Sequence, residues 1–131
     1  MDAAALLGLP TVNAFVGANH LLSLEDNFKL FEKVWPDLVR YAEDRDVRIG
    51  IENCPMLFEN TWPFGLNLAR TPAIWRRMFE IIPSPNFGLN YDPSHLRMQL
   101  IQTGSQDYAN LLEPVCIRHV LLASSSRWEA Y

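Results

Sequence analysis

Two acidic residues and a histidine occupy matching positions in two separate segments of the chain. Glu52 follows the strand-like run 48–51, and Asp92 follows a second such run, 86–91, with His95 three residues further on. The carboxyl ends of parallel strands meet at one edge of an α/β sheet, so we expect these side chains to lie close together. Two neighbouring carboxylates repel each other unless a cation or a shared proton lies between them. With His95 as a further donor, the sequence predicts a divalent metal site.

Several of these residues also fit purely structural roles. Asp92 followed by Pro93 is the pattern of a helix N-cap with proline in the first turn, so a capping role for Asp92 stays open. Asn53 and Asn90 either orient the two carboxylates by hydrogen bonds or serve in turns and caps. We interpret His20, in the loop after the first apolar segment, as a solvated residue and not as a ligand.

Two aromatic residues, Trp62 and Phe64, lie in the long segment 55–70 that follows Glu52. An aromatic ring on a loop at this edge packs either against a sugar ring or against apolar neighbours in a lid. Trp62 is therefore a candidate substrate contact, with the lid role as its alternative.

The spacing of apolar residues predicts strands that alternate with amphipathic helices. Strands are expected at 11–16, 47–53, 87–91 and 115–122. Helices are expected at 3–9, 24–44 and 71–82, with shorter helical pieces at 94–101 and 107–112. Ser23 with Asp26, and Thr71 with Pro72, match the signals that start helices, and Pro36 should bend the long helix.

The two longer helices each carry one apolar face. In the first of them this face comprises Leu24, Phe28, Phe31, Trp35, Leu38 and Ala42. In the second it comprises Ile74, Trp75, Met78, Phe79, Ile81 and Ile82. Both faces are expected to cover the sheet.

Successive strand ends are separated by about one strand, loop and helix each. Such units are right-handed crossovers in a parallel sheet. A closed barrel of eight units needs about 250 residues, whereas this chain of 131 residues holds about four units. The expected fold class is therefore α/β, a partial (β/α)8 TIM barrel with parallel strands, in which residues 1–131 form a single partial domain.

A partial barrel leaves its first and last strands with unpaired edges, which favour pairing with another chain. We therefore expect the chain to form a homodimer or to bind a complementing barrel fragment.

Composition narrows the partners and the compartment. A formal net charge of −4 without a basic cluster argues against nucleic acid, and no apolar stretch approaches the length of a membrane span. The start of the chain lacks the positive residues of a secretory signal, so we expect a cytoplasmic protein. Cys54 and Cys116 form neither a disulfide framework nor a close metal pair, and both are expected to be reduced.

Three runs of residues together carry a resemblance to a known family. They are Ile51-Glu52-Asn53-Cys54-Pro55-Met56, then Asn67-Leu68-Ala69-Arg70-Thr71-Pro72-Ala73-Ile74-Trp75, then Gly88-Leu89-Asn90-Tyr91-Asp92-Pro93-Ser94-His95-Leu96. The chain resembles the sugar phosphate isomerase/epimerase family of the xylose isomerase-like TIM barrels, over about residues 3–119.

The resemblance implies a metal-dependent isomerase or epimerase that acts on a sugar, sugar phosphate or polyol-derived keto substrate by proton transfer next to a carbonyl. In that family a divalent ion, commonly manganese, magnesium or zinc, is held by a Glu, an Asp, a His and a second Glu. Glu52 is implied as a metal ligand and as the catalytic base, Asp92 as the second ligand and His119 as the third.

The expected substrate contacts are His95, Trp62 and Asn90, and the expected partner is a small sugar or polyol. An inosose-type dehydratase would use the same metal and base with loss of water. The family's last ligand, a glutamate on the eighth strand, has no counterpart in this chain. A non-catalytic or truncated barrel fragment that serves in binding or assembly is therefore an alternative. An endonuclease of the same fold would need more ligands and a basic face.

Overall fold

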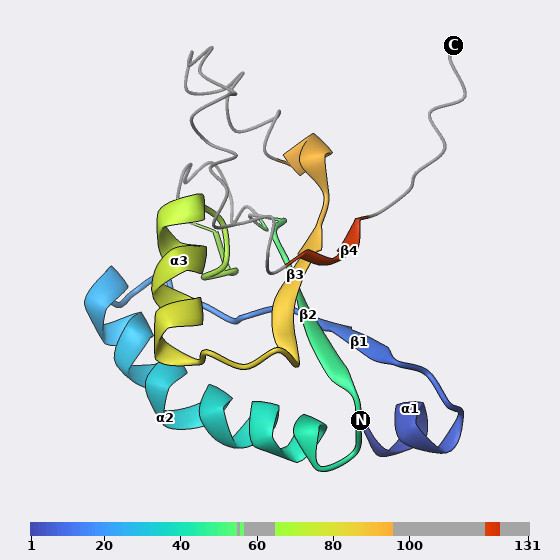
Figure 1. Ribbon diagram of the computed structural model, residues 1–131. Coiled ribbons are helices and arrows are strands. Elements are labelled where there is room, and N and C mark those ends of the chain that lie inside the picture. The colour runs from blue at the N-terminus through green and yellow to red at the C-terminus, as the bar shows by residue number, and fades with distance from the viewer. Residues whose placement is uncertain (55, 57–64, 96–119, 124–131) are drawn as a thin grey trace, which may run out of the picture.

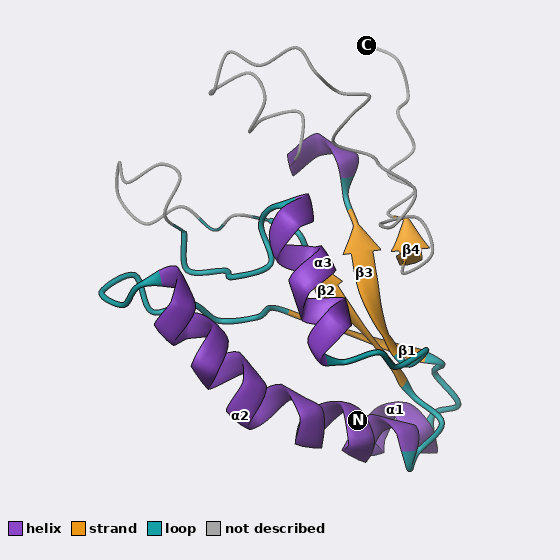
Figure 2. Cartoon of the chain, turned by 60° about the vertical axis from the view of Figure 1, so that its left-hand side comes forward, coloured by secondary structure: helices purple, strands orange, loops and turns teal. Residues whose placement is uncertain are grey.

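The computed structural model describes residues 1–54, 56, 65–95 and 120–123 of the chain, and these include a four-stranded parallel sheet with strand order β1-β2-β3-β4. The strands are β1 (Thr11–Ala14), β2 (Arg48–Glu52), β3 (Phe87–Tyr91) and β4 (Val120–Ala123). The helices are α1 (Asp2–Leu6), α2 (Leu24–Glu43) and α3 (Pro72–Ile81). Helices α2 and α3 lie on one side of the sheet (Figures 1 and 2). None of the described helices is long and apolar enough to cross a lipid bilayer.

The helices start where local side chains satisfy their free amides. Ser23 caps α2, because its hydroxyl accepts a hydrogen bond from the backbone amide of Asp26 at 3.1 Å. Thr71 caps α3 in the same way, and Pro72 occupies the first turn, where no amide donor is needed. After α1 the chain turns at Gly8, whose φ of 67° suits a residue without a Cβ.

The two central strands, β2 and β3, present opposite chemistry on their two faces. Ile49 and Ile51 pair in register with Phe87 and Leu89, and all four side chains are buried. Because side chains alternate along a strand, the other face carries Gly50 and Glu52 beside Gly88 and Asn90. The apolar face packs against the helices, which leaves the polar face for the site.

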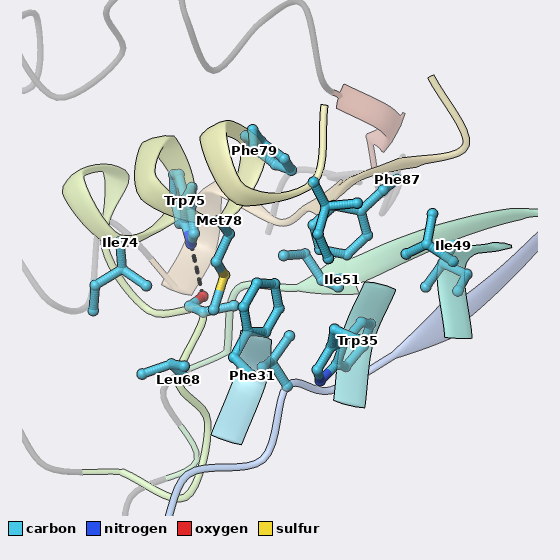
Figure 3. Packing of buried hydrophobic residues seen from close by; sticks show 14 of the residues in the cluster. Phe31, Trp35, Ile49, Ile51, Leu68, Ile74, Trp75, Met78, Phe79 and Phe87 are labelled. Carbon is cyan, nitrogen blue, oxygen red and sulfur yellow. Dashed lines mark hydrogen bonds between the residues drawn. The ribbon is translucent and has the colours of Figure 1, made fainter. Parts of the chain in front are cut away.

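Aromatic rings dominate the core between helices and sheet. The ring of Phe87 on β3 lies 6.1 Å from that of Phe31, 5.6 Å from Trp35 and 5.5 Å from Phe79, measured between centroids (Figure 3). Such tilted and edge-to-face contacts add to the stabilisation from burial. Trp75 is fully buried, and its indole N–H donates to the Ala69 carbonyl at 2.8 Å.

Most of the expected elements are present, and the α/β parallel architecture is confirmed. The first strand ends at Ala14 and not at residue 16, because the chain leaves β2 there and instead forms an antiparallel bridge between Gly17 and Asn67. The last strand runs to Ala123. Residues 94 and 95 of the predicted helical piece 94–101 are described and helical. The rest of that piece, the piece at 107–112 and residues 115–119 of the predicted last strand lie outside the described residues.

The predicted buried face of α2 is partly wrong. Leu24 is 46% exposed and Leu38 is 38% exposed, whereas Asn27 and Val39 are buried. The helix is rotated so that the stripe through Phe28, Phe31 and Trp35 contacts the sheet, which turns the flanking leucines outward. On α3, Ile81 is only partly buried, and the rest of the predicted face is buried.

Replacing Phe87 by alanine should lower the free energy of unfolding by about 3–5 kcal/mol, because it leaves a cavity among the core rings. Urea unfolding followed by tryptophan fluorescence measures this change. Leu30→Ala, at a position 48% exposed on α2, is the control and should change stability by no more than about 0.5 kcal/mol. Equal effects of the two substitutions would contradict the assignment of the core.

Candidate functional site

Glu52, Asp92 and His95 come together at the carboxyl edge of the sheet. Glu52 is the last residue of β2, and Asp92 directly follows β3, its parallel neighbour. His95 lies in the helical turn after Asp92. Its Nε2 atom is 3.8 Å from Glu52 Oε1 and 3.8 Å from Asp92 Oδ2. The histidine therefore faces both carboxylates, and all three side chains keep partial access to solvent.

The carboxylate of Glu52 is held from one side by Asn90. Asn90 Nδ2 donates to Glu52 Oε2 at 2.7 Å, and the Asn53 amide donates to Oε1 at 3.1 Å. The two side chains meet because Glu52 pairs with Asn90 across β2 and β3. A Cβ at Gly50 would lie 3.3 Å from the Asn90 Cβ, so glycine leaves Asn90 the room it needs. This bond fits the role of orienting a carboxylate that was weighed for Asn90, and its contact with substrate stays a prediction.

Asn53 fixes the backbone of Asp92 and not its carboxylate. Its Nδ2 donates to the Asp92 carbonyl at 2.9 Å, and its Oδ1 accepts from the Asp92 amide at 2.8 Å. Asp92 Oδ1 in turn accepts from the Ser94 amide at 2.8 Å. The capping role weighed for Asp92 is thus present, and it leaves Oδ2 facing His95. The cap uses Oδ1, and the other oxygen of the same carboxylate faces the histidine.

Asn67 supports the site, although no role was predicted for it beyond its place in the run 67–75 that carries the family resemblance. This fully buried side chain donates to the carbonyls of Glu52 at 2.7 Å and Cys54 at 2.6 Å, and accepts from the Ala69 amide at 3.0 Å. It ties the loop before α3 to the end of β2. The one signal in the sequence is a polar residue between Leu66 and Leu68.

Burial raises the pKa of Glu52 above the ordinary value of 4.5. The positive charge available at His95 and the Asn53 amide act in the opposite direction, and the nearby charge of Asp92 acts with burial. A carboxylate with a raised pKa is a stronger base than an exposed glutamate. Glu52 is therefore well suited to accept a proton from a weak carbon acid.

The geometry and the sequence lead to the same family. A model of the xylose isomerase-like TIM barrels matches residues 1–129 of the chain. The chain belongs to this family. No curated protein matches it closely. Its parallel strands with a carboxylate at successive carboxyl ends agree with a portion of such a barrel, a family that includes sugar isomerases and epimerases.

Donor atoms of this xylose isomerase-like barrel suit part of a metal site. Two ligand atoms at about 2.1 Å from one ion lie at most about 4.2 Å apart, so each 3.8 Å distance from His95 would allow this imidazole to share an ion with one of the carboxylates. The ligand set that the family implies instead joins Glu52 and Asp92 with His119. No group of three or more His, Cys, Asp and Glu side chains among the described residues is placed to hold a metal. His119 and Trp62 lie outside the described residues, so the complete ligand set stays a prediction. His20 is exposed in the loop after β1.

Replacing Asn67 by alanine should lower the free energy of unfolding by about 1–3 kcal/mol, because it leaves buried backbone groups without their partner. Chemical denaturation measures this loss. Asn13→Ala, on the exposed face of β1, is the matched control and should have a much smaller effect. If both substitutions lower the free energy of unfolding by a similarly small amount, the supporting role of Asn67 is contradicted.

The raised pKa of Glu52 also predicts how stability depends on pH. The folded state holds the proton more tightly than the unfolded state, so the contribution of Glu52 to stability falls as pH rises from about 4.5 through the raised pKa. The glutamine side chain of the Glu52→Gln variant is neutral at every pH, so this variant does not lose stability as the pH rises through that range. Its melting temperature relative to the unsubstituted chain should therefore increase over that range. Melting curves from pH 4 to 8 test this, with the exposed Glu80→Gln as a control that shows no such trend.

Proposed function

We propose that this chain takes part in metal-dependent isomerisation or epimerisation of a sugar, sugar phosphate or polyol-derived keto substrate. The observation that supports this most is the convergence of Glu52 and Asp92 on His95 Nε2, at 3.8 Å each. A base, a second acid and a hydrogen-bonding imidazole at one accessible edge suit proton transfer next to a carbonyl. Membership of a family that includes sugar isomerases and epimerases supports the same substrate class.

In this proposal Glu52 accepts the proton from the carbon next to the substrate carbonyl. The electrons of the broken C–H bond form the enediolate, and the proton resides on the Glu52 carboxyl group. Return of this proton to the neighbouring carbon, with transfer of the hydroxyl proton from one oxygen to the other, gives isomerisation. Epimerisation needs a second proton donor, such as a water molecule, to protonate the original carbon from the opposite face, after which Glu52 releases its proton to solvent. Asn90 keeps the carboxylate in place during the transfer, since it holds Oε2 at 2.7 Å.

A divalent ion of the manganese, magnesium or zinc type would be held by Glu52 and Asp92 with His119. When bound, such an ion polarises the substrate carbonyl and favours loss of the adjacent proton. Each carboxylate oxygen has more than one lone pair, so ligation does not prevent Glu52 from acting as a base. His95 hydrogen-bonds a substrate hydroxyl through Nε2, and Trp62 is proposed as a further sugar contact.

Turnover of ketopentoses, their phosphates and inososes in the presence of Mn²⁺ tests the proposal. Glu52→Gln should reduce kcat by about 10²–10⁴-fold, the usual contribution of a general base. Glu80→Gln, which removes the same charge from an exposed position on α3, should leave kcat unchanged. Loss of water from an inosose instead of isomerisation would identify a dehydratase. Activity that survives Glu52→Gln would remove this residue from the catalytic role.

Metal binding has its own test. Asp92→Asn should weaken Mn²⁺ binding in calorimetry by at least about tenfold, because it removes the charged ligand. Asparagine still caps a helix well, so the fold should be retained. Metal binding without turnover of any substrate would support a binding module, and unchanged binding by Asp92→Asn would show that the ligand set is wrong.

A further inference from the structure

A second polar feature lies at the carboxyl edge of the sheet, the edge that also carries the acidic cluster of Glu52 and Asp92. It is a pocket between the loop that follows β1 and the loop that leads into α3. The first loop contributes Asn19 and His20, the second contributes Leu68 and Arg70, and Asn27 of α2 also lines it. None of the functions assigned above uses these residues.

The walls of this pocket are held in place by hydrogen bonds. Asn27 is buried; its Nδ2 donates to the carbonyls of Asn19 at 3.0 Å and Ser23 at 2.9 Å, and its Oδ1 accepts from the Asn19 amide at 2.7 Å. The two loops are joined by backbone bonds from Ala18 to the Leu66 carbonyl and from Leu68 to the Val16 carbonyl. The pocket is therefore formed without a ligand.

The side chains around the pocket favour a negative ligand. The described residues that line it include a guanidinium, an imidazole and the amide of Asn19 beside apolar side chains, and no carboxylate. The amide of Asn27 is already bonded to backbone carbonyls. Burial lowers the pKa of Arg70, which means that its charge is poorly hydrated. A poorly hydrated guanidinium gains more from an anionic partner than an exposed one does. Arg70 also directly precedes Thr71, the cap at the positive end of α3.

The loop formed by residues 66–68 contacts both the pocket and the strand end that carries Glu52. Asn67 lies in the chain between Leu66, which is bonded to the β1 loop, and Leu68, which lines the pocket. The same Asn67 donates to the Glu52 carbonyl at 2.7 Å. One loop thus positions both the proposed base and the cationic wall, at the same edge of the sheet.

We propose that this pocket is a subsite for the phosphoryl group of a sugar phosphate, with Arg70 as its principal charge partner and His20 as a second donor. This inference rests on the proposed function for the sugar portion of the ligand. It selects phosphorylated ketoses over free ketoses as substrates. The binding of the phosphoryl group itself depends only on the pocket.

Titration of the full chain, followed by ¹⁵N–¹H NMR, tests the subsite with inorganic phosphate, a ketopentose phosphate and the unphosphorylated ketopentose. The first two should shift the amide signals of Asn19, His20 and Arg70, and the ketopentose phosphate should bind more tightly. Arg70→Gln should weaken the binding of inorganic phosphate and of the ketopentose phosphate by about tenfold or more, as expected for loss of a charge-assisted hydrogen bond. The unphosphorylated sugar should leave these signals unchanged.

Arg48→Gln is the matched control, because it removes the same charge from an exposed residue at the opposite end of β2. Equal weakening by both substitutions would indicate general electrostatic attraction and overturn the subsite. Arg70→Lys and the exposed-loop variant His20→Gln guard against a folding defect, and both should weaken phosphate binding less than Arg70→Gln. Phosphate binding that is equally strong in all of these variants would also overturn the subsite.

The two proposals fail in different ways. Glu52→Gln should bind inorganic phosphate as the unsubstituted chain does, since Glu52 does not line the pocket. Phosphate binding without any turnover would uphold the subsite and remove the proposed function. Turnover of a ketopentose phosphate that is unaffected by Arg70→Gln would uphold the function and overturn the subsite. A ketopentose phosphate that binds no better than inorganic phosphate would overturn the assignment to substrate.

Discussion

The register between β2 and β3 is the constraint on which the site depends. It places Glu52 opposite Asn90, and the hydrogen bond between their side chains follows from that pairing. The register is in turn fixed by the burial of Ile51 and Leu89 on the other face. A slip of one residue would turn Glu52 into the core and an isoleucine into the site, so the apolar core and the polar site specify each other.

Neutral amides provide the internal support of this edge. Among the described residues, the buried polar side chains are all asparagines: Asn27, Asn53, Asn67 and Asn90. Each holds a strand end, a loop or a carboxylate through bonds of 2.6–3.4 Å. A buried amide that is fully bonded costs far less than a buried charge. The charges of Glu52 and Asp92 can therefore face the accessible side, where a ligand can use them.

The sequence predicted what local chemistry decides and missed what tertiary contacts decide. Helix caps such as Ser23 and Thr71 were predictable, because each acts within one turn. The positions of Glu52 and Asp92 at the ends of two strand-like runs were equally local. The rotation of α2, which exposes Leu38 and buries Val39, depends on how the helix crosses the sheet. Asn67 depends on a bridge to Gly17 across a long loop. No pattern in one sequence encodes such a contact.

Gly50 shows how the central strand connects foldability to specificity. A side chain there would press on Asn13 Oδ1 and on the Cβ of Asn90, each at 3.3 Å. The strain would be relieved first by movement of these polar side chains, since the opposite face of β2 is packed. Position 50 is thus one where a library selected for expression and a library selected for turnover should accept different residues. Substitutions at position 50 would therefore change substrate selectivity indirectly, by moving the side chains of Asn13 and Asn90.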